Sequence, residues 1–323
     1  MKDFKGKLAV VTGGGSGMGR EIVRQLVAEG AHVALCDMSA EAMAETVTLA
    51  NAGNRSRVTT HLCDVSNEAD MMRFRDEVLA QHQQDHVDLL FNNAGIGGGG
   101  SFVAGDRAEW ERTFSVCWQG VYLGCRAFVP LLIKAEEGHV VNVSSVNGFW
   151  GSIGPETPHT AYVAAKFAVK GFTEALIADL RVNAPHVRAS VVMPGHIGTR
   201  IVENSAKILG QKDVASMDAS DIAAARDALA ASGAAVAGLS DAEVREILTA
   251  RIKAFEITAP TSAEQAATII LDGVRADKWR ILVGEDAHAI DTMVRETPEE
   301  ADEPDFAKRL AGQGHFRALF EAL

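Results

Sequence analysis

The stretch "KLAVVTGGGSGMGR" (residues 7–20) joins a short apolar run to a glycine-rich turn and to the start of an amphipathic pattern. A continuous apolar run of this kind is typical of a strand buried on both faces of a parallel sheet. Gly13, Gly17 and Gly19 give the spacing G-x-x-x-G-x-G directly before the expected helix. Such a turn lets the backbone approach a pyrophosphate, whose charge is met by the N–H groups and dipole of the helix N-terminus. The stretch therefore predicts a dinucleotide-binding α/β fold.

The rest of the chain repeats this alternation of short apolar runs and longer helical patterns. Strands are expected at residues 7–12, 32–36, 57–62, 87–92, 139–144, 187–193 and 280–284. Helices are expected at residues 18–29, 40–51, 67–82, 109–134 and 162–183. Alternation with right-handed crossovers predicts an α/β protein with a Rossmann-type, doubly wound parallel sheet of about seven strands.

The alternation is interrupted once, by residues 201–257, where Ala-rich patterns such as "DIAAARDALAASGAAVAG" predict helices before the last strand. We interpret this segment as a helical insertion over the carboxyl edge of the sheet. It would act either as a lid or as a surface for subunit contacts, and the sequence does not favour one over the other.

The whole chain, residues 1–323, is predicted to be a single domain. Its core would comprise about 6–200 and 258–284, followed by a C-terminal extension over 285–323. Within the extension, "ETPEEADEPD" (296–305) has six acidic residues and no basic one. A solvated and partly flexible stretch is expected there.

Charge and cysteine usage restrict the partners and the compartment. A net charge of −12 argues against nucleic acid and anionic membrane surfaces, because both attract basic footprints. No apolar run reaches the roughly 18 residues of a membrane-spanning helix, and the N-terminal run is too short and glycine-broken for a signal peptide.

The four cysteines, Cys36, Cys63, Cys117 and Cys125, show no metal-ligand spacing, so no metal is predicted. Four thiols without a signal peptide fit a reducing cytoplasm, each as a small buried hydrophobe.

Asp37 follows the second expected strand, 18 residues after Gly19. A carboxylate at this place can accept hydrogen bonds from both hydroxyls of an adenosine ribose and would repel a 2′-phosphate. The surrounding "LCDMSA" contains no Lys or Arg, and Arg20 is expected to lie along its helix, so NAD is favoured over NADP. The alternative is that Asp37 caps the helix that begins near Ser39.

"AYVAAK" (161–166) places Tyr162 four residues before Lys166, on the same face of a helix. An ammonium beside a phenol favours the phenolate, which would improve Tyr as an acid-base catalyst, since its ordinary pKa is about 10. Taken alone, the pair is more typical of an amphipathic helix with a snorkelling lysine. "GIGGGGS" (95–101) is also glycine-rich, and we expect a mobile loop there.

Six motifs follow one another along the chain and change this interpretation. They are "TGGGSGMG" (12–19), "CDV" (63–65), "NNAG" (92–95), "VNVSS" (141–145), "YVAAK" (162–166) and "MPGHIGT" (193–199). With them the chain resembles the short-chain dehydrogenases/reductases, in their compact single-domain branch. The resemblance runs through residues 6–200 and resumes at about 258–284.

The resemblance implies Ser145, Tyr162 and Lys166 as catalytic residues. Tyr162 would protonate a carbonyl oxygen in reduction or, as the phenolate, take the alcohol proton in oxidation. Ser145 would donate a hydrogen bond to the same oxygen, and Lys166 would hold the nicotinamide ribose and bias Tyr162 toward the phenolate.

The resemblance also implies a cofactor site. Its members are Gly13, Ser16, Gly17, Met18, Gly19, Asp37, Asp64, Val65, Asn93, Tyr162, Lys166, Pro194, Gly195, Ile197 and Thr199. Asp64 would contact the adenine amino group, while Ile197 and Thr199 would contact the nicotinamide carboxamide and the phosphate.

Two features depart from the family pattern. The family's "VNxxG" is "VCWQG" (116–120) here, so Cys117 replaces an Asn that helps to distort a helix and to lead a water toward the lysine. The backbone distortion could survive this change, but the side-chain amide is lost, which leaves an adapted and an impaired proton relay as alternatives. In addition, "GPETPH" (154–159) enlarges the loop between Ser145 and Tyr162.

These features predict an NAD-dependent oxidoreductase that interconverts a secondary alcohol and a ketone, with NADP as the less favoured cofactor. The alternative, which rests on Cys117, is a catalytically weak dinucleotide-sensing or scaffolding protein. Asn147, Phe149, Trp150 and His159, with the insertion, predict a roomy and mostly apolar pocket, and hence a lipophilic or cyclic substrate. The family implies a homodimer or homotetramer.

Overall fold

The computed structural model describes residues 1–50, 56–152, 158–231 and 235–314. Most of the expected enlarged loop at 154–159 therefore lies outside the described residues. Over the described part of the chain, no helix is both long enough and apolar enough to cross a membrane.

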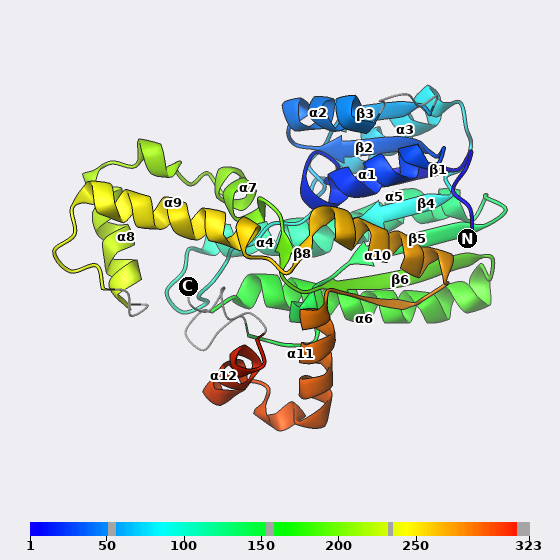
Figure 1. Cartoon of the computed structure of the whole chain (residues 1–323). Coiled ribbons are helices and arrows are strands. Elements are labelled where there is room, and N and C mark those ends of the chain that lie inside the picture. The colour runs from blue at the N-terminus through cyan, green and yellow to red at the C-terminus, as the bar shows by residue number, and fades with distance from the viewer. Residues whose placement is uncertain (51–55, 153–157, 232–234, 315–323) are drawn as a thin grey trace.

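Seven parallel strands form one sheet in the order β3-β2-β1-β4-β5-β6-β9 (Figure 1). The strands are β1 (Leu8–Thr12), β2 (His32–Asp37), β3 (Val58–Leu62), β4 (Leu89–Asn92), β5 (Gly138–Val143), β6 (Val187–Pro194) and β9 (Arg280–Val283). The strand order reverses at β1, between β2 and β4, and ligands of open α/β sheets bind at such a switch point. The predicted doubly wound, Rossmann-type sheet is confirmed.

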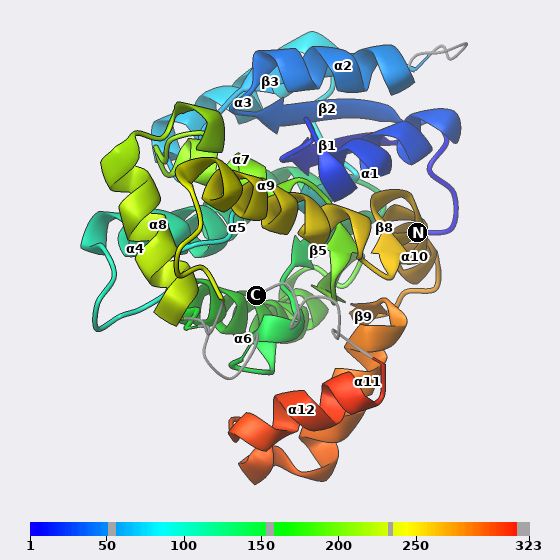
Figure 2. The ribbon, with the colours of Figure 1, turned by 60° about the vertical axis from the view of Figure 1, so that its left-hand side comes forward.

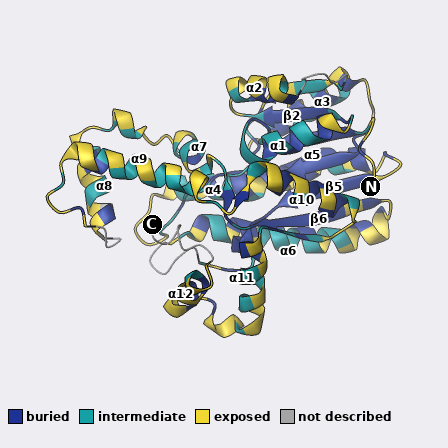
Figure 3. Cartoon of the chain, in the orientation of Figure 1, coloured by how far each residue is buried: buried dark blue, intermediate teal, exposed yellow. Residues whose placement is uncertain are grey.

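Helices cover both faces of the sheet and bury an apolar core on each. On one face lie α1 (Gly17–Ala28), α2 (Ala40–Ala50) and α10 (Ala263–Arg275). On the other lie α3 (Glu68–His82), α5 (Gly120–Leu132) and α6 (Thr160–Asn183). Figure 3 shows the buried residues concentrated in the sheet between these two layers. This explains why the strands are continuous apolar runs.

The helix expected at 109–134 is not one regular helix. It consists of α4 (Arg107–Phe114), a π-helical turn (Ser115–Gln119) and α5. The N–H of Gly120 donates to the carbonyl of Ser115, five residues earlier, which widens the helix locally. Cys117 sits in the middle of this turn, so the backbone distortion exists without the family's Asn.

The segment 201–257 contains α7 (Ile201–Ile208), α8 (Ala219–Ala231) and α9 (Asp241–Ile257). Figures 1 and 2 show α8 and α9 extending away from the sheet, whereas α7 lies against the body of the domain. Two short strands that the sequence did not predict, β7 (Ile197–Gly198) and β8 (Thr261–Ser262), pair in parallel. This pairing joins the start and the end of the insertion.

The acidic residues of the stretch 296–305 are exposed to solvent, as expected, but the chain is held to the domain within and just after this stretch. Between α11 (Glu285–Glu296) and α12 (Pro304–Gly312), the carbonyl of the buried Ala301 accepts a 2.8 Å hydrogen bond from Trp150 Nε1. Phe306 is buried against the Trp150 ring. The prediction rested on the acidic composition of this stretch and overlooked the apolar residues of α12, which hold the tail against the domain.

Candidate active site

Two neighbouring cavities open at the carboxyl edge of the sheet. The larger, a groove of about 720 Å³, passes the ends of β1, β2 and β4. The smaller, a pocket of about 340 Å³, lies between Ser145, Tyr162 and α7. Ile201 lines both cavities, so the two spaces are adjacent at the start of α7.

The glycine loop forms the floor of the groove through close backbone packing. Gly13 and Gly17 have φ angles of +65° and +53°, a conformation that side chains other than glycine rarely adopt. A Cβ on Gly19 would lie 2.1 Å from the carbonyl oxygen of Gly13. Only a chain without side chains at these positions can bring the start of α1 this close to β1.

Asn93 ties this loop to the end of β4. Its Nδ2 donates to the carbonyl of Thr12 at 3.0 Å and to that of Gly13 at 3.3 Å. Its Oδ1 is buried and has no hydrogen-bond partner among the described residues. Because Asn93 lines the groove, a hydroxyl of a bound dinucleotide could satisfy this acceptor. The loop, the orphaned oxygen and the shape of the groove therefore fit a nicotinamide dinucleotide.

Asp37 lies in the wall of the groove. Its carboxylate accepts hydrogen bonds from the N–H groups of Gly15 at 3.0 Å and Ser39 at 3.1 Å. Ser39 Oγ accepts from the N–H of Ala42, so the cap of α2 is Ser39 and the alternative role for Asp37 is wrong. Arg20 does not simply lie along its helix, because its guanidinium donates to the carbonyl of Gly15.

Asp64 lines the groove beside Val65, but its carboxylate is already bound. Ser66 donates to Oδ1 through its N–H and its hydroxyl, and Arg112 forms a 2.8 Å ion pair with Oδ2. Partial burial opposes ionisation, yet Ser66 and Arg112 hold the pKa of Asp64 below its ordinary value. An ionised carboxylate is therefore available to accept from a ligand N–H.

The other predicted cofactor residues divide between the two cavities. Ser16, Met18 and Thr199 line the groove, whereas Gly195 lines the pocket. Pro194, which ends β6, and the buried Ile197 line neither cavity. Their contacts with a cofactor remain predictions.

Ser145, Tyr162 and Lys166 come together at the boundary of the two cavities. Tyr162 and Ser145 both line the pocket, and the Ser145 side chain lies near enough to lower the pKa of Tyr162. Lys166 Nζ lies 5.3 Å from the centre of the Tyr162 ring and donates to the carbonyl of Val143 at 3.0 Å. Gly95 lines the groove, and a Cβ added to it would lie 3.4 Å from the Lys166 ammonium.

The charge of Lys166 acts on the pKa of Tyr162 in the expected direction, but burial of the phenol acts in the opposite one. Burial of the phenol raises the pKa of Tyr162 above its ordinary value, although Lys166 and Ser145 both act to lower it. In this state Tyr162 is therefore a neutral proton donor at pH 7. Loss of solvent, which the helical spacing did not reveal, outweighs the nearby charge.

Cys117 lies close to this group. Its thiol is buried and donates a 3.1 Å hydrogen bond to the carbonyl of Ile96. The four cysteines are all buried and unbridged, as predicted.

The pocket wall contains residues that the sequence did not single out. Gly97 and Ser205 are two of them, and the N–H of Gly97 donates to Ser205 Oγ at 2.8 Å. The expected mobile loop at 95–101 is therefore hydrogen-bonded and forms part of the site. Phe149, which we expected in the pocket, instead packs beneath Arg280, whose guanidinium lies 5.4 Å from its ring centre.

Asp286, at the start of α11, positions the chain that follows β6. Its Oδ2 accepts a 2.6 Å hydrogen bond from the N–H of His196, which lines the pocket. A Cβ on Gly195 would lie 2.3 Å from either carboxylate oxygen. Sequence reasoning missed Asp286, since it lies about 90 residues from the motif it supports.

A glycine loop at the switch point of a doubly wound sheet, beside a pocket with a paired Ser and Tyr, defines a nucleotide-binding oxidoreductase of the Rossmann type. Residues 7–209 match the family model described as short chain dehydrogenase. The chain belongs to the short-chain dehydrogenase/reductase family.

Three relatives illustrate the similarity. The SadH protein of Mycobacterium tuberculosis is 34% identical over 296 residues, which cover 91% of this chain and 92% of that protein. Cyclopentanol dehydrogenase of a Comamonas strain is 37% identical over 198 residues, covering 61% and 75%. A solved short-chain dehydrogenase/reductase of Burkholderia phymatum, in complex with NAD, has a TM-score of 0.72 and 30% identity, covering 93% and 95%.

The packing around Gly19 generates a test with an internal control. Gly19→Ala should force the loop open at a cost of about 1–3 kcal/mol, which corresponds to roughly 5- to 150-fold weaker NAD binding. Gly171→Ala, in α6 with no atom within 4 Å of the new Cβ, should bind NAD like the wild type. Calorimetric titration with NAD checks both variants. Unchanged affinity in Gly19→Ala, with its circular dichroism intact, would contradict this account of the loop.

Proposed function

We propose that the protein is an NAD-dependent dehydrogenase or reductase that interconverts a secondary alcohol and a ketone. The observation that carries this proposal is that Ser145 and Tyr162 lie together in the wall of a pocket next to a groove that fits a dinucleotide. The buried Lys166 beside the phenol adds the third member of the group.

The three side chains have distinct tasks in this proposal. The bound nicotinamide supplies or accepts the hydride. Tyr162 gives its proton to the carbonyl oxygen, or takes the proton of the alcohol in the reverse direction. Ser145 donates a hydrogen bond to the same oxygen and stabilises the negative charge that develops there. Lys166 reduces the cost of forming the phenolate, because its positive charge lies beside the ring.

The preference for NAD is supported by the charges around Asp37. Glu41 and Glu45, on α2, line the groove together with Asp37. Arg20, bonded to the Gly15 carbonyl, forms a 2.6 Å ion pair with Glu45, and Arg200 in the same groove also acts on Glu45, so the charge of Glu45 is compensated. Asp37 and Glu41 remain as the carboxylates that would repel a 2′-phosphate.

The pocket supports a small lipophilic or cyclic substrate. Its walls are mainly apolar, with Trp150, Leu209 and Phe255 among them. At the packing density of protein interiors, about 0.75, a cavity of 340 Å³ holds roughly 250 Å³ of ligand, a molecule of about a dozen heavy atoms. The similarity to cyclopentanol dehydrogenase agrees in suggesting a cyclic alcohol or ketone.

Cys117 supports the alternative of a weakly active protein that senses or scaffolds through its dinucleotide. Against it, the π-helical turn at 115–119 keeps the helix distorted without the Asn. The other parts of our proposal, namely assembly as a homodimer or homotetramer and a cytoplasmic location, rest on the family and on the free thiols.

Tyr162→Phe tests the proposed proton transfer. It should reduce turnover on the order of 10²–10⁴-fold while NAD binding stays close to that of the wild type, because only the hydroxyl is lost. The measurement is the absorbance of the reduced cofactor with a panel of secondary alcohols. Tyr122→Phe is a matched control, since Tyr122 is the chain's other tyrosine and is exposed on α5. Substantial residual activity in Tyr162→Phe would show that another group moves the proton.

Asp37 tests the cofactor preference. Asp37→Ala should weaken NAD binding by roughly 10-fold or more, because the ribose hydroxyls lose their hydrogen bonds to the charged carboxylate. Asp37→Asn keeps an oxygen acceptor for the Gly15 N–H but removes the charge, so NADP should gain relative to NAD. Dissociation constants for both cofactors measure this change. A wild type that already prefers NADP would refute the carboxylate argument.

Cys117→Asn separates the enzyme from the sensing alternative. Because the π-helical turn is already present, the variant should turn over within a few-fold of the wild type or faster. A much faster variant with a smaller solvent isotope effect would show that the wild-type relay is impaired. If neither protein turns over any substrate while both bind NAD, the sensing alternative is favoured.

A further inference from the structure

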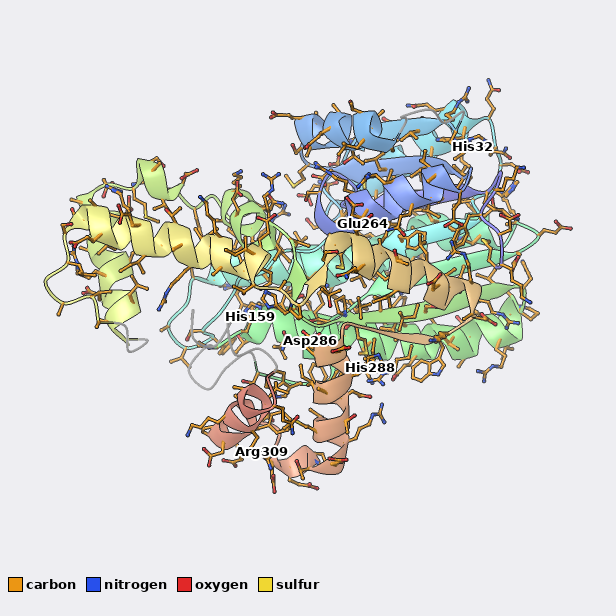
Figure 4. The ribbon with its side chains drawn as sticks, in the orientation of Figure 1. His32, His159, Glu264, Asp286, His288 and Arg309 are labelled. Carbon is orange, nitrogen blue, oxygen red and sulfur yellow. The ribbon has the colours of Figure 1, made fainter. Side chains whose placement is uncertain are left out.

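His159 is a polar side chain of the pocket that the proposed reaction does not use. It directly precedes α6 and lines the same cavity as Tyr162. The two rings have centres 4.7 Å apart and are tilted by 34°. Figure 4 labels His159 near the beginning of α6, on the side from which α9 extends. The imidazole thus lies alongside the phenol rather than at the far end of the pocket.

Other polar side chains of the pocket are engaged within the protein. Asn147 Nδ2 donates to the carbonyls of Trp150 and Ser152, at 3.0 and 2.9 Å. His196 Nε2 bonds the carbonyl of Phe255 at 2.6 Å.

Ser205 is also engaged, since its hydroxyl donates to the carbonyl of Ile201 at 2.5 Å and accepts from the N–H of Gly97. Gln211 belongs to the exposed rim of the pocket.

The His159 ring, in contrast, makes no hydrogen bond within the described residues. Burial lowers the pKa of His159 to about 4, so the imidazole is neutral at pH 7. A neutral imidazole presents one N–H donor and one nitrogen acceptor. Leaving such a group without a partner in a mostly apolar pocket is unfavourable, and a ligand that bonds it gains selectivity over one that cannot.

We propose that His159 selects substrates that carry a second oxygen, a hydroxyl or a carbonyl, one or two carbons from the carbon that reacts at Tyr162. This inference rests on the proposed function. The side-by-side rings support the position, because a substituent near the reacting carbon reaches the imidazole. The substrate class is thus a cyclic or lipophilic diol, hydroxyketone or diketone.

Matched substrates test this selection. We would measure kcat and KM with NAD for cyclohexane-1,2-diol and cyclohexanol, which differ in one hydroxyl. The wild type should show the higher kcat/KM for the diol. In His159→Phe, which keeps a ring but no nitrogen, the diol-to-cyclohexanol ratio of kcat/KM should fall roughly 10- to 100-fold, mostly through KM. His159→Gln, which both donates and accepts, should recover part of that ratio.

Leu209→Ala serves as the control, because it removes apolar surface from another part of the same pocket. It should lower kcat/KM for both substrates alike and leave their ratio near that of the wild type. A ratio that is unchanged in His159→Phe, or that falls equally in Leu209→Ala, would overturn the selection by His159. A wild type that oxidises cyclohexanol but not the diol would overturn it too, and the proposed function would stand. If the wild type binds NAD but oxidises neither these two alcohols nor any other, the proposed function fails and this inference fails with it.

Discussion

The close approach of the first helix to the first strand is the constraint on which the rest of the site depends. There is no room for a side chain between Gly19 and the carbonyl of Gly13, and Asn93 fixes that carbonyl from the neighbouring strand. This packing opens the groove at the point where the sheet reverses its strand order. Ser16, Gly17 and Met18, at the start of α1, line this groove, and the N-terminus of a helix is a favourable place for a pyrophosphate.

The start of the insertion connects this groove to the pocket. Asn204 donates a 3.1 Å hydrogen bond to Ser16 in the glycine loop, and its neighbour Ser205 accepts from Gly97 in the pocket wall. The helix α7 therefore touches both cavities, and Ile201 lines both. These contacts give the lid interpretation a physical basis, although α8 and α9 extend away from the sheet (Figure 2). The hydrogen bonds to Ser16 and Gly97 would have to break for α7 to move.

The fold could be predicted from the sequence because the buried strands are continuous apolar runs. The spacing of the glycines in the first loop also indicates the tight turn between the first strand and the first helix. The Ser, Tyr and Lys of the site were found because the motifs that contain them are short and contiguous. Asp286 could not be found, because its role arises only when α11 reaches the end of β6. The π-helical turn was anticipated only through the family resemblance, and Cys117, which replaces the residue that would indicate it, left its presence open. The contacts that hold the exposed acidic tail to the domain were missed because its acidic residues outnumber the few apolar ones that pack.

Tyr162 shows why the chemistry depends on what fills the two cavities. Burial raises the pKa of the Tyr162 phenol and keeps it protonated despite the nearby ammonium of Lys166. In the proposed reaction, a phenol that holds its proton would suit reduction of a ketone, while oxidation of an alcohol would need Lys166 and Ser145 to stabilise the phenolate.

The central claim is that hydride passes between the carbinol carbon of a secondary alcohol and NAD in this site. Its most direct test uses cyclohexanol deuterated at the carbinol carbon, with mass spectrometry of the reduced cofactor after incubation with the protein. The account predicts that the reduced cofactor carries one deuterium for each molecule of ketone formed. Reduced cofactor without deuterium, or no reduced cofactor with any secondary alcohol despite normal NAD binding, would contradict it.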